Sequence, residues 1–360
     1  MTSRIRTAII GFGMSGKVFH GPFLADNPAY SLDAIVTGNP ERAAQAAALH
    51  PRARIVPTTD ELFEHAANLD LLVIGTPPST HVELAGAALD HGLHVVVDKP
   101  FVPTAVDGEA LVARARAAGR LLTVFQNRRW DADFLTVKRL VADGELGEVH
   151  VFESRFDQWK PEGLRAWKGT LSLAEGGGLL ADLGPHLIDQ ALQLFGPAVE
   201  VYGETARHSA PREAEADDDA FVSLLHASGV RSHLSMNLLA ALPSPRFRVL
   251  GSAAAFESWG LDSQQAQLDA GMTPSDPAYG VEPEEKWGTV GTPGETRRVR
   301  PERGAYQEFY RLLAEAITAG GPLPVDAEDS LAAIRIIEEI HALNRTSSSF
   351  PNIGKSPSIR

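Results

Sequence analysis

The sequence predicts an α/β protein whose first third forms a doubly wound parallel sheet. Three observations support this prediction: short apolar runs alternate with alanine-rich segments, the runs are nonpolar on both faces, and the first run leads into a glycine-rich turn. Strands that are apolar on both faces are typical of parallel sheets covered by helices. Their alternation with helices indicates right-handed βαβ units.

The predicted elements follow one another at short intervals. Helices are expected at residues 41–49, 82–89 and 107–118. Because such sheets bind ligands at the carboxyl ends of their strands, the residues that follow each strand are the candidate site. The expected strands are residues 7–10, 32–36, 71–74, 95–97 and 121–125.

The first strand leads into a glycine motif, and a helix is predicted to begin near Lys17. Gly-x-Gly-x-x-Gly between a strand and a helix predicts dinucleotide binding. The first glycine permits a tight turn, the second lets a pyrophosphate approach the backbone, and the third allows close helix packing. N–H groups at the helix start favour phosphate. The expected cofactor-binding residues here are Gly11, Phe12, Gly13, Met14, Ser15 and Gly16.

The same residues match part of a phosphate loop, from Gly11 to Gly16 and Lys17. Such a loop needs a hydroxyl at the next position to hold Mg²⁺. Val18 has none, so a P-loop NTPase is the weaker interpretation.

The end of the second strand bears on which dinucleotide binds. A carboxylate there would accept hydrogen bonds from the ribose 2′-hydroxyl of NAD. Thr37, Asn39 and Arg42 follow the strand instead, and Glu41 is expected at the start of the next helix. Small polar residues and an arginine suit a 2′-phosphate, which favours NADP, with NAD as the alternative. In the simpler interpretation Arg42 is an exposed helix residue.

Two further loops belong to the same edge of the sheet. Consecutive prolines after one strand give a rigid loop suited to line a cofactor site. An ammonium at the end of a central strand would lie near the reactive end of a dinucleotide, unless it forms a surface ion pair with its acidic neighbour. The residues are Thr76, Pro77 and Pro78 after one strand and Asp98, Lys99 and Pro100 after the next.

Two more polar side chains belong to this edge. His81 begins a predicted helix, where capping or packing is favoured over proton transfer. Asn127 follows the last predicted strand, where a cofactor or substrate contact is expected.

A second glycine run lies far along the chain, at residues 176–178, and precedes Asp182, Pro185 and His186. The aspartate and histidine are four residues apart, so on a helix they project from one face. A histidine beside a carboxylate suits proton transfer near neutral pH. The simpler interpretation is a helix with Pro185 in its first turn and Asp182 as its cap. Capping and catalysis do not exclude one another.

Together these motifs resemble those of the glucose–fructose oxidoreductase / inositol dehydrogenase / MocA family. The resemblance extends from about residue 5 to about residue 343 and rests on the glycine loop, Thr76-Pro77, Asp98-Lys99-Pro100 in place of the usual Glu-Lys-Pro, and Gly176-Gly-Gly…Asp182…His186. Residues 11–22, 127–131 and 186–190 are most similar to NADP-dependent scyllo-inositol dehydrogenase-like members.

The resemblance implies a nucleotide domain at residues 1–126 and a substrate-binding and oligomerisation domain at 127–345. The Ser, Pro and Gly content of residues 346–360 predicts a flexible tail. The second domain would be an α/β module with an open, mainly antiparallel sheet, through which the chain would form a homodimer or homotetramer. Its last helices, at residues 306–319 and 327–343, would pack back near the first domain. Its expected strands are residues 148–156, 200–206, 220–226, 230–237, 247–250 and 254–258.

The resemblance also implies an NADP-dependent dehydrogenase acting on an inositol, sugar or related polyol. His186 would be the general base, Asp182 would bind a substrate hydroxyl, and Lys99 would stabilise the reacting oxygen. Asn127, Trp159 and Trp167 would contact substrate, although core packing explains the two tryptophans equally well. The alternative is a non-catalytic NADP(H) sensor, which should have lost Lys99 or His186; both are present.

Composition excludes several other classes. The 360 residues favour two domains, and a formal charge of −13 argues against nucleic acid as a partner. The chain has no cysteine, which excludes disulfides and thiolate metal sites. We expect no metal, no membrane span, no signal peptide and a cytoplasmic location. The five acids between residues 213 and 219 are expected to form a solvated loop.

Overall fold

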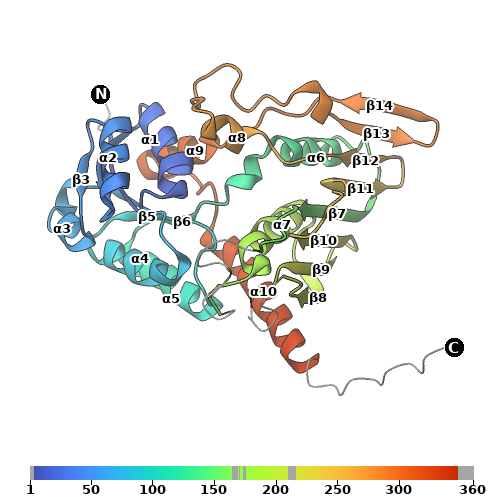
Figure 1. Cartoon of the computed structure of the whole chain (residues 1–360), viewed down its shortest axis with the longest axis horizontal. Coiled ribbons are helices and arrows are strands. Elements are labelled where there is room, and N and C mark those ends of the chain that lie inside the picture. Colours follow the sequence, from blue (N-terminus) through green and yellow to red (C-terminus); the bar gives the residue numbers. More distant parts are fainter. Residues whose placement is uncertain (1–3, 164–168, 170, 173–175, 210–215, 348–360) are drawn as a thin grey trace.

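Two sheets organise the chain, one in each half (Figure 1). The computed structural model describes residues 4–163, 169, 171–172, 176–209 and 216–347. The predicted fold class is confirmed: a doubly wound parallel sheet is followed by a second, mainly antiparallel sheet. Among the described helices, none is both long and apolar enough to cross a membrane.

The first sheet is parallel, with the strand order β3-β2-β1-β4-β5-β6 in the described part of the chain. The chain passes outward from β1 to β3 and returns to β4 on the other side of β1. The loops after β1 and β4 therefore border the point where the strand order reverses, which is where ligands of such sheets bind. The strands are β1 (Ile5–Ile10), β2 (Tyr30–Val36), β3 (Arg54–Val56), β4 (Leu71–Ile74), β5 (His94–Val97) and β6 (Leu122–Val124).

Helices connect these strands close to the predicted positions. Asn39 caps the first of them by accepting a hydrogen bond from the Arg42 N–H at 3.0 Å, and Thr104 caps the last in the same way. The helices are α2 (Pro40–Leu49), α3 (Thr59–Phe63), α4 (His81–Asp90) and α5 (Ala105–Ala118), with short 3₁₀ turns η2 (Ala66–Asn68) and η3 (Pro78–Thr80).

The segment after the glycine motif differs from the single helix predicted near Lys17. A π-helical turn, η1 (Ser15–His20), precedes the short helix α1 (Gly21–Asp26). The Gly21 N–H bonds the Gly16 carbonyl five residues earlier. Pro22 follows directly and has no N–H to donate, so it cannot continue the preceding hydrogen-bond ladder. Single π-helical turns of this kind are frequent at functional sites.

The second sheet has the order β14-β13-β12-β11-β7-β10-β9-β8 in the described residues. Its strands pair antiparallel except for β7 with β10. Burial alternates along β9 and β10, so one face packs on helices. The strands are β7 (Val149–Asp157), β8 (Ala198–Ala206), β9 (Asp219–His226), β10 (Arg231–Asn237), β11 (Phe247–Gly251), β12 (Ala255–Ser258), β13 (Gly288–Thr292) and β14 (Glu295–Val299).

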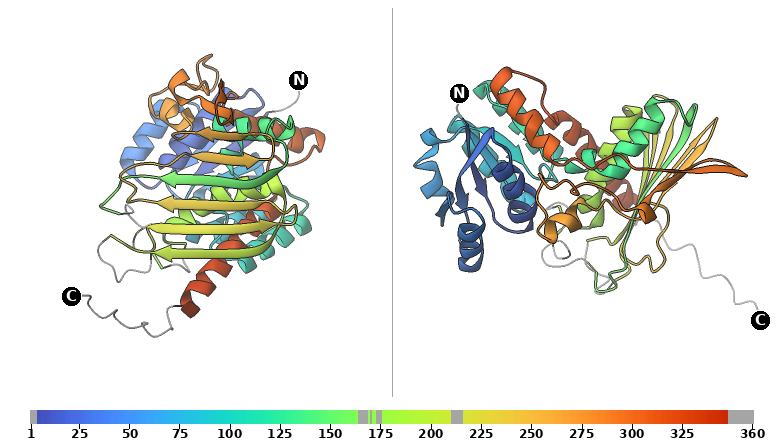
Figure 2. Two further views of the ribbon diagram at one scale, coloured as in Figure 1. Left: turned by 90° about the vertical axis from the view of Figure 1, so that its right-hand side faces the viewer. Right: turned by 90° about the horizontal axis from the view of Figure 1, so that it is seen from above.

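One face of this sheet is covered by helices and the other is open, as both views in Figure 2 show. The helix that follows the second glycine run, α7, packs on β7, β9 and β10 and lies between the two sheets. The helical elements of this half are η4 (Asn127–Trp130), α6 (Ala132–Ala142), α7 (Leu179–Phe195), α8 (Gln264–Asp269), η7 (Glu284–Lys286), α9 (Gln307–Ala319) and α10 (Ala327–Ser347).

The end of the chain returns to the first sheet. Phe309, Tyr310 and Leu313 of α9 are fully buried in the same core as Phe23 and Phe125 of the first domain. Figure 1 shows α9 beside α1, far from the second sheet. The apolar face of α9 therefore joins the last part of the sequence to the nucleotide-type domain.

Candidate active site

The glycine loop lies at the point where the strand order reverses. Gly11 has a φ of +94°, and a Cβ there would lie 2.7 Å from the Gly75 carbonyl oxygen after β4. A Cβ on Gly16 would lie 2.1 Å from the Gly11 carbonyl oxygen. Gly13, in contrast, has open space around its Cα. The first and third glycines are thus required by packing, and the second leaves the backbone accessible to a ligand.

The loop also offers a polar group that a phosphate would satisfy. The Ser15 hydroxyl is buried and has no hydrogen-bond partner among the described residues. Ser15 begins η1, and a Cβ on Gly75 would lie 2.9 Å from its oxygen. Buried polar groups are almost always paired in folded proteins. The unsatisfied hydroxyl and the open backbone at Gly13 fit the pyrophosphate of a dinucleotide.

Arg42 reaches over the glycine loop from α2. One of its guanidinium nitrogens lies 3.9 Å from the position of a Cβ on Gly13. No ion pair of Arg42 is present within the described chain. Asn39 holds the start of α2, and the Asn39 N–H contacts the Thr37 hydroxyl at 3.4 Å. The guanidinium is therefore positioned beside the loop, not on the far side of the helix.

Phe12, Met14 and the proline loop are placed differently from one another. The Phe12 side chain is buried in a small cluster with Ile35 and Ala46, so only its backbone faces the loop. The Met14 side chain is 65% exposed. Pro77 is exposed whereas Pro78 is buried at the start of η3.

His81 connects the two loops that follow β4 and β5. Its Nε2 lies 2.9 Å from the Thr76 carbonyl oxygen, and its Nδ1 lies 3.1 Å and 3.0 Å from the carbonyl oxygens of Pro100 and Phe101. The ring is fully buried. The packing interpretation of His81 therefore agrees with the geometry, and the histidine fixes the two loops relative to each other.

Lys99 lies at the centre of the candidate site and contacts α7. Its Nζ donates to the Asp182 carboxylate at 3.0 Å and to the Asp182 carbonyl at 2.9 Å. The two side chains are 19% and 16% exposed, so they are mostly shielded from water. The prediction of a surface ion pair between Lys99 and Asp98 is wrong, because the Lys99 Nζ is bonded to Asp182. Asp98 instead accepts a hydrogen bond from the backbone N–H of Lys99. The Lys99–Pro100 peptide bond is cis.

His186 lies one turn after Asp182 on α7 and is buried, with 4% of its surface exposed. The four-residue spacing places both side chains on one side of the helix. The Lys99–Asp182 bond thus joins the loop after β5 to α7, and the third predicted catalytic residue, His186, follows one turn later on the same helix.

The simpler interpretation of the α7 start is wrong. The helix begins at Leu179, so Asp182 lies inside its first turn instead of at the cap, and Pro185 lies further inside the helix. The cap is Asp217, whose carboxylate accepts a hydrogen bond from the Leu180 N–H at 2.8 Å and whose carbonyl accepts one from the Leu179 N–H. Glycine is required at position 178, where a Cβ would lie 2.2 Å from the Asp217 carboxylate.

The acidic run that was predicted to be a solvated loop is therefore partly buried. Asp217 and Asp218 are 3% and 1% exposed. Burial raises the pKa of Asp217 to about 7, although the Leu180 N–H opposes that rise. Burial also acts on Asp218, but hydrogen bonds from Ser209 and His208 outweigh it and lower the pKa of that carboxyl. The prediction of exposure followed from the many charges in the run, and it did not identify Asp217 as the cap of α7.

The other predicted site residues are placed as follows. Asn127 is buried at the start of η4, directly after β6. Trp159 is 58% exposed, so core packing does not explain it; it pairs with Leu239 where β7 and β10 continue beyond the sheet. Trp167 lies outside the described residues.

A network of buried charges holds α7 against the junction of the two domains, and sequence patterns did not reveal it. Arg129 of η4 donates two hydrogen bonds to Asp189 of α7, at 2.8 Å and 2.6 Å, and a third to Asp329 of α10. Arg246 donates to Gln190 at 3.0 Å and lies 3.5 Å from the Asp133 carboxylate. These contacts fix the helix that carries His186.

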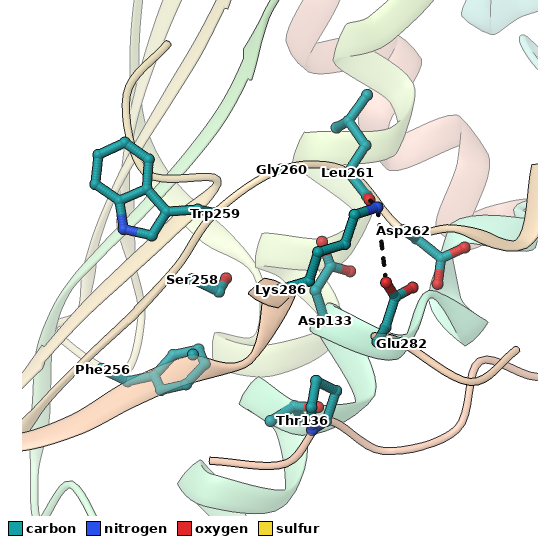
Figure 3. Close-up of a pocket in the computed structure, with 12 residues that line it drawn as sticks. Asp133, Thr136, Phe256, Ser258, Trp259, Gly260, Leu261, Asp262, Glu282 and Lys286 are labelled. Atoms are coloured by element: carbon teal, nitrogen blue, oxygen red, sulfur yellow. Dashed lines mark hydrogen bonds and ion pairs between the residues drawn. The ribbon is translucent and has the colours of Figure 1, made fainter. Parts of the chain in front are cut away.

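A small cavity lies beside this network, between α6 and the segment that precedes η7 (Figure 3). Asp133, Asp262, Glu282 and Lys286 line it, and the Lys286 Nζ is bonded to the Leu261 carbonyl at 2.7 Å. Its volume of about 20 Å³ fits a single water molecule. Burial raises the pKa of Asp133 to about 7, which Arg246 opposes. The cavity is too small for a substrate, and no metal-binding cluster is found among the described side chains.

The doubly wound sheet has a Gly-x-Gly-x-x-Gly loop at the point where its strand order reverses, and α7 brings a carboxylate to Lys99 at the same edge. This arrangement is that of an NAD(P)-binding oxidoreductase. Comparison with known families identifies which one. Residues 5–126 match the model described as oxidoreductase family, NAD-binding Rossmann fold, and residues 134–257 match that of the GFO/IDH/MocA C-terminal domain. The chain belongs to the GFO/IDH/MocA family, as its motifs indicated.

Several relatives match over nearly the whole chain. The scyllo-inositol 2-dehydrogenase (NADP(+)) IolW of Bacillus subtilis is 35% identical over 338 residues, covering 93% of this chain and 92% of its own length. An uncharacterized oxidoreductase of Escherichia coli, YdgJ, is 37% identical over 348 residues, with 94% and 96% covered. The solved structure of the oxidoreductase yvaA from Bacillus subtilis has a TM-score of 0.89 at 32% identity and covers 96% of this chain and 98% of that one.

Proposed function

We propose that this protein is an NADP-dependent dehydrogenase that interconverts a secondary alcohol and a ketone, or a lactol and a lactone, on an inositol, sugar or related polyol. The observation that carries the proposal is the bond from Lys99 of the nucleotide domain to Asp182, one turn before His186 on α7. It is supported by the similarity to the NADP-dependent scyllo-inositol dehydrogenase of Bacillus subtilis.

In this proposal the glycine loop and Ser15 hold the pyrophosphate of the cofactor, and Arg42 pairs with the 2′-phosphate. Bound NADP supplies the acceptor, or in its reduced form the donor, of a hydride. An arginine beside a loop without an acidic residue favours a phosphate over a bare 2′-hydroxyl. The loops after β4 and β5, joined through His81, form the adjoining wall.

Side chains of the protein would transfer the hydroxyl proton and stabilise charge on the substrate oxygen. His186 removes the hydroxyl proton as general base and returns it in the reverse direction. Lys99 donates a hydrogen bond to the same oxygen and stabilises negative charge that develops on it. Asp182 orients the Lys99 ammonium at 3.0 Å and accepts a hydrogen bond from a neighbouring substrate hydroxyl. Asn127 and Trp159 are the proposed further substrate contacts.

The test is a panel of inositols, aldoses and linear polyols, assayed with NADP⁺ and with NAD⁺ in parallel. We expect turnover of at least one cyclic polyol or sugar and a higher kcat/KM with NADP⁺. Tight NADPH binding without turnover of any panel member would favour the sensor alternative. Activity with NAD⁺ alone would remove the role given to Arg42.

We also propose that copies of the chain associate through the open face of the second sheet. Phe221 and His233 lie in contact on that face, with ring centroids 6.1 Å apart. They are half-buried and alternate along β9 and β10 with the fully buried residues of the covered face; Figure 2 shows the other face of the sheet open. Light scattering of the purified protein should give a dimer or tetramer, and Phe221→Lys should shift it toward the monomer. A monomeric parent protein would contradict this arrangement.

A further inference from the structure

A second cavity lies at the opposite edge of the parallel sheet from the glycine loop. It has a volume of about 640 Å³. Its walls come from the amino ends of β1, β4, β5 and β6, together with η2 and the last turn of α9. A strand of six residues separates the two edges by roughly 20 Å. A ligand in this cavity would therefore not touch the cofactor loops.

The charged side chains of this cavity are mostly basic. Arg4, Arg6, Arg120, His91 and His94 line it, and among the described lining residues Asp70 is the single acid. This is unusual in a chain whose formal charge is −13. From these side chains we propose that the cavity, here called the basic cavity, binds a small phosphorylated molecule at a site separate from the cofactor site.

Asp70 does not neutralise the basic cavity, because Arg6 already engages it. The Arg6 guanidinium donates to the two Asp70 oxygens at 3.0 Å and 2.7 Å, and the Arg6 N–H adds a third bond at 2.9 Å. Arg4 and Arg120 form no ion pair within the described chain, and both are exposed. Two guanidinium groups therefore remain available at the mouth of the cavity.

His94 adds a donor of fixed orientation. The Leu121 N–H donates to its Nδ1 at 3.0 Å, so the proton of the neutral imidazole must be on Nε2. Burial and the nearby charge of Arg120 lower the pKa of His94, and Asp70 only partly opposes them. Arg120 and His94 therefore lie close enough to act on the same ligand.

Helix ends account for only part of this arrangement. His91 and Arg120 follow the carboxyl ends of α4 and α5, where positive charge is favourable in any protein. Arg4 and Arg6 lie at the start of a strand, where no such effect operates. The Arg120 guanidinium lies beside Gly92, 3.5 Å from where a Cβ would be. His91 is held by stacking on Phe63 at 4.8 Å.

The ligand class follows from these donors. Guanidinium groups form paired hydrogen bonds with phosphate oxygens, and the two that Asp70 does not engage suit a dianion, with the His94 Nε2–H as a further donor. The volume falls within the range of small-molecule sites, so a phosphorylated metabolite fits better than a bare ion. Apolar atoms of Ile5, Leu69 and Ile317 would contact its carbon frame.

The test is calorimetric titration of the full chain with pyrophosphate and with inorganic phosphate at constant ionic strength. The protein is first saturated with NADPH, so that the glycine loop and Arg42 are occupied. We expect one equivalent of pyrophosphate to bind, and Arg4→Gln/Arg120→Gln to weaken its Kd by at least about tenfold. The matched control is Arg54→Gln/Arg300→Gln, which removes two exposed arginines outside the cavity and should leave the Kd unchanged.

Three results would overturn the proposal. The first is no pyrophosphate binding by the NADPH-saturated parent protein. The second is an equal loss of affinity in the cavity variant and the matched control, since this would reflect net charge only. The third is binding of citrate as tight as that of pyrophosphate, which would remove the assignment to phosphate chemistry. Turnover of polyols plays no part in this readout, so its outcome is independent of the proposed enzymatic function.

Discussion

The cofactor edge and the domain junction of this protein are built from different kinds of contact. At the cofactor edge, glycines at positions 11 and 16 allow backbone to approach backbone, and His81 is held by carbonyl oxygens. At the junction, side chains of full charge meet in the interior, as in the Arg129–Asp189 pair. The first region specifies where a ligand goes, and the second specifies how α7 is presented to it.

This difference predicts that mutations in the two regions fail in different ways. Replacing a polar group at the cofactor edge should cost catalysis more than stability, because the Lys99–Asp182 pair there, at 19% and 16% exposed, is less buried than the Arg129–Asp189 pair of the junction. Removing one member of a buried pair leaves a desolvated charge, so the loss should appear in the free energy of unfolding.

The largest effect is expected for the groups that meet at the cofactor edge. Lys99→Ala and His186→Ala should each lower kcat by about 10²–10⁴-fold, the usual contribution of proton transfer or oxyanion stabilisation. NADPH affinity, measured by fluorescence titration, should change little because neither residue belongs to the glycine loop. Near-parental kcat in His186→Ala would exclude it as the general base.

At the junction, Arg129→Ala should lower the free energy of unfolding by about 3–5 kcal/mol, because Asp189 is left buried without its partner. The two side chains are 11% and 3% exposed. Urea denaturation measures the loss. Arg311→Ala is the control: its partners Glu308 and Glu315 pair with a side chain that is 48% exposed, so the expected change is below about 1 kcal/mol. Equal losses in the two variants would remove the distinction between the regions.

The same difference explains what the sequence predicts and what it does not. The loops after β1, β4 and β5 were predicted because parallel strands bring their carboxyl ends to one edge, and glycine has few uses other than close approach. The bond from Lys99 to Asp182 spans 83 residues and follows from neither strand pattern nor spacing. Only the resemblance to a family placed the two residues in one site.

Buried charges are harder to predict because a charged residue is normally exposed. Asp217 belongs to a run of acids, and nothing local shows that it caps a helix 37 residues earlier. Arg129 and Asp189 are 60 residues apart. The hairpin of β13 and β14 was missed for a related reason: only Val290 and Val299 show clear apolar burial there. Its Pro293-Gly294 turn was the available signal.

Asp217, which caps α7, should make the free energy of unfolding depend on pH. Its pKa in the folded state is about 7, above the ordinary value near 4, so the folded protein binds the proton more tightly. Stability is therefore lost as pH rises from about 4 to about 7. Asp217→Asn keeps an acceptor for the Leu180 N–H and does not titrate. The free energy of unfolding of the variant minus that of the parent, measured by urea denaturation, should be about 1–3 kcal/mol higher at pH 8 than at pH 5.

Asp218→Asn is the matched control for this measurement. The pKa of Asp218 is lowered, so that carboxylate is ionised in both the folded and the unfolded chain between pH 5 and pH 8. Its substitution should destabilise the protein by the same amount at both pH values. A pH-dependent difference for Asp218→Asn, or none for Asp217→Asn, would contradict the assignment of the buried proton to Asp217.

The smallest effect is expected for Arg42, which is proposed to bind the 2′-phosphate while the glycine loop binds the pyrophosphate. Arg42→Ala removes one exposed charge and leaves the glycine loop intact, so NADP affinity should fall by about tenfold, or about 1.4 kcal/mol. NAD affinity should not change, because NAD lacks the 2′-phosphate. Arg54→Ala removes an exposed arginine at the start of β3 and should alter neither affinity. Equal weakening of both cofactors by Arg42→Ala would mean that the guanidinium supports the loop itself, and the cofactor edge would then depend on side-chain charge as the junction does.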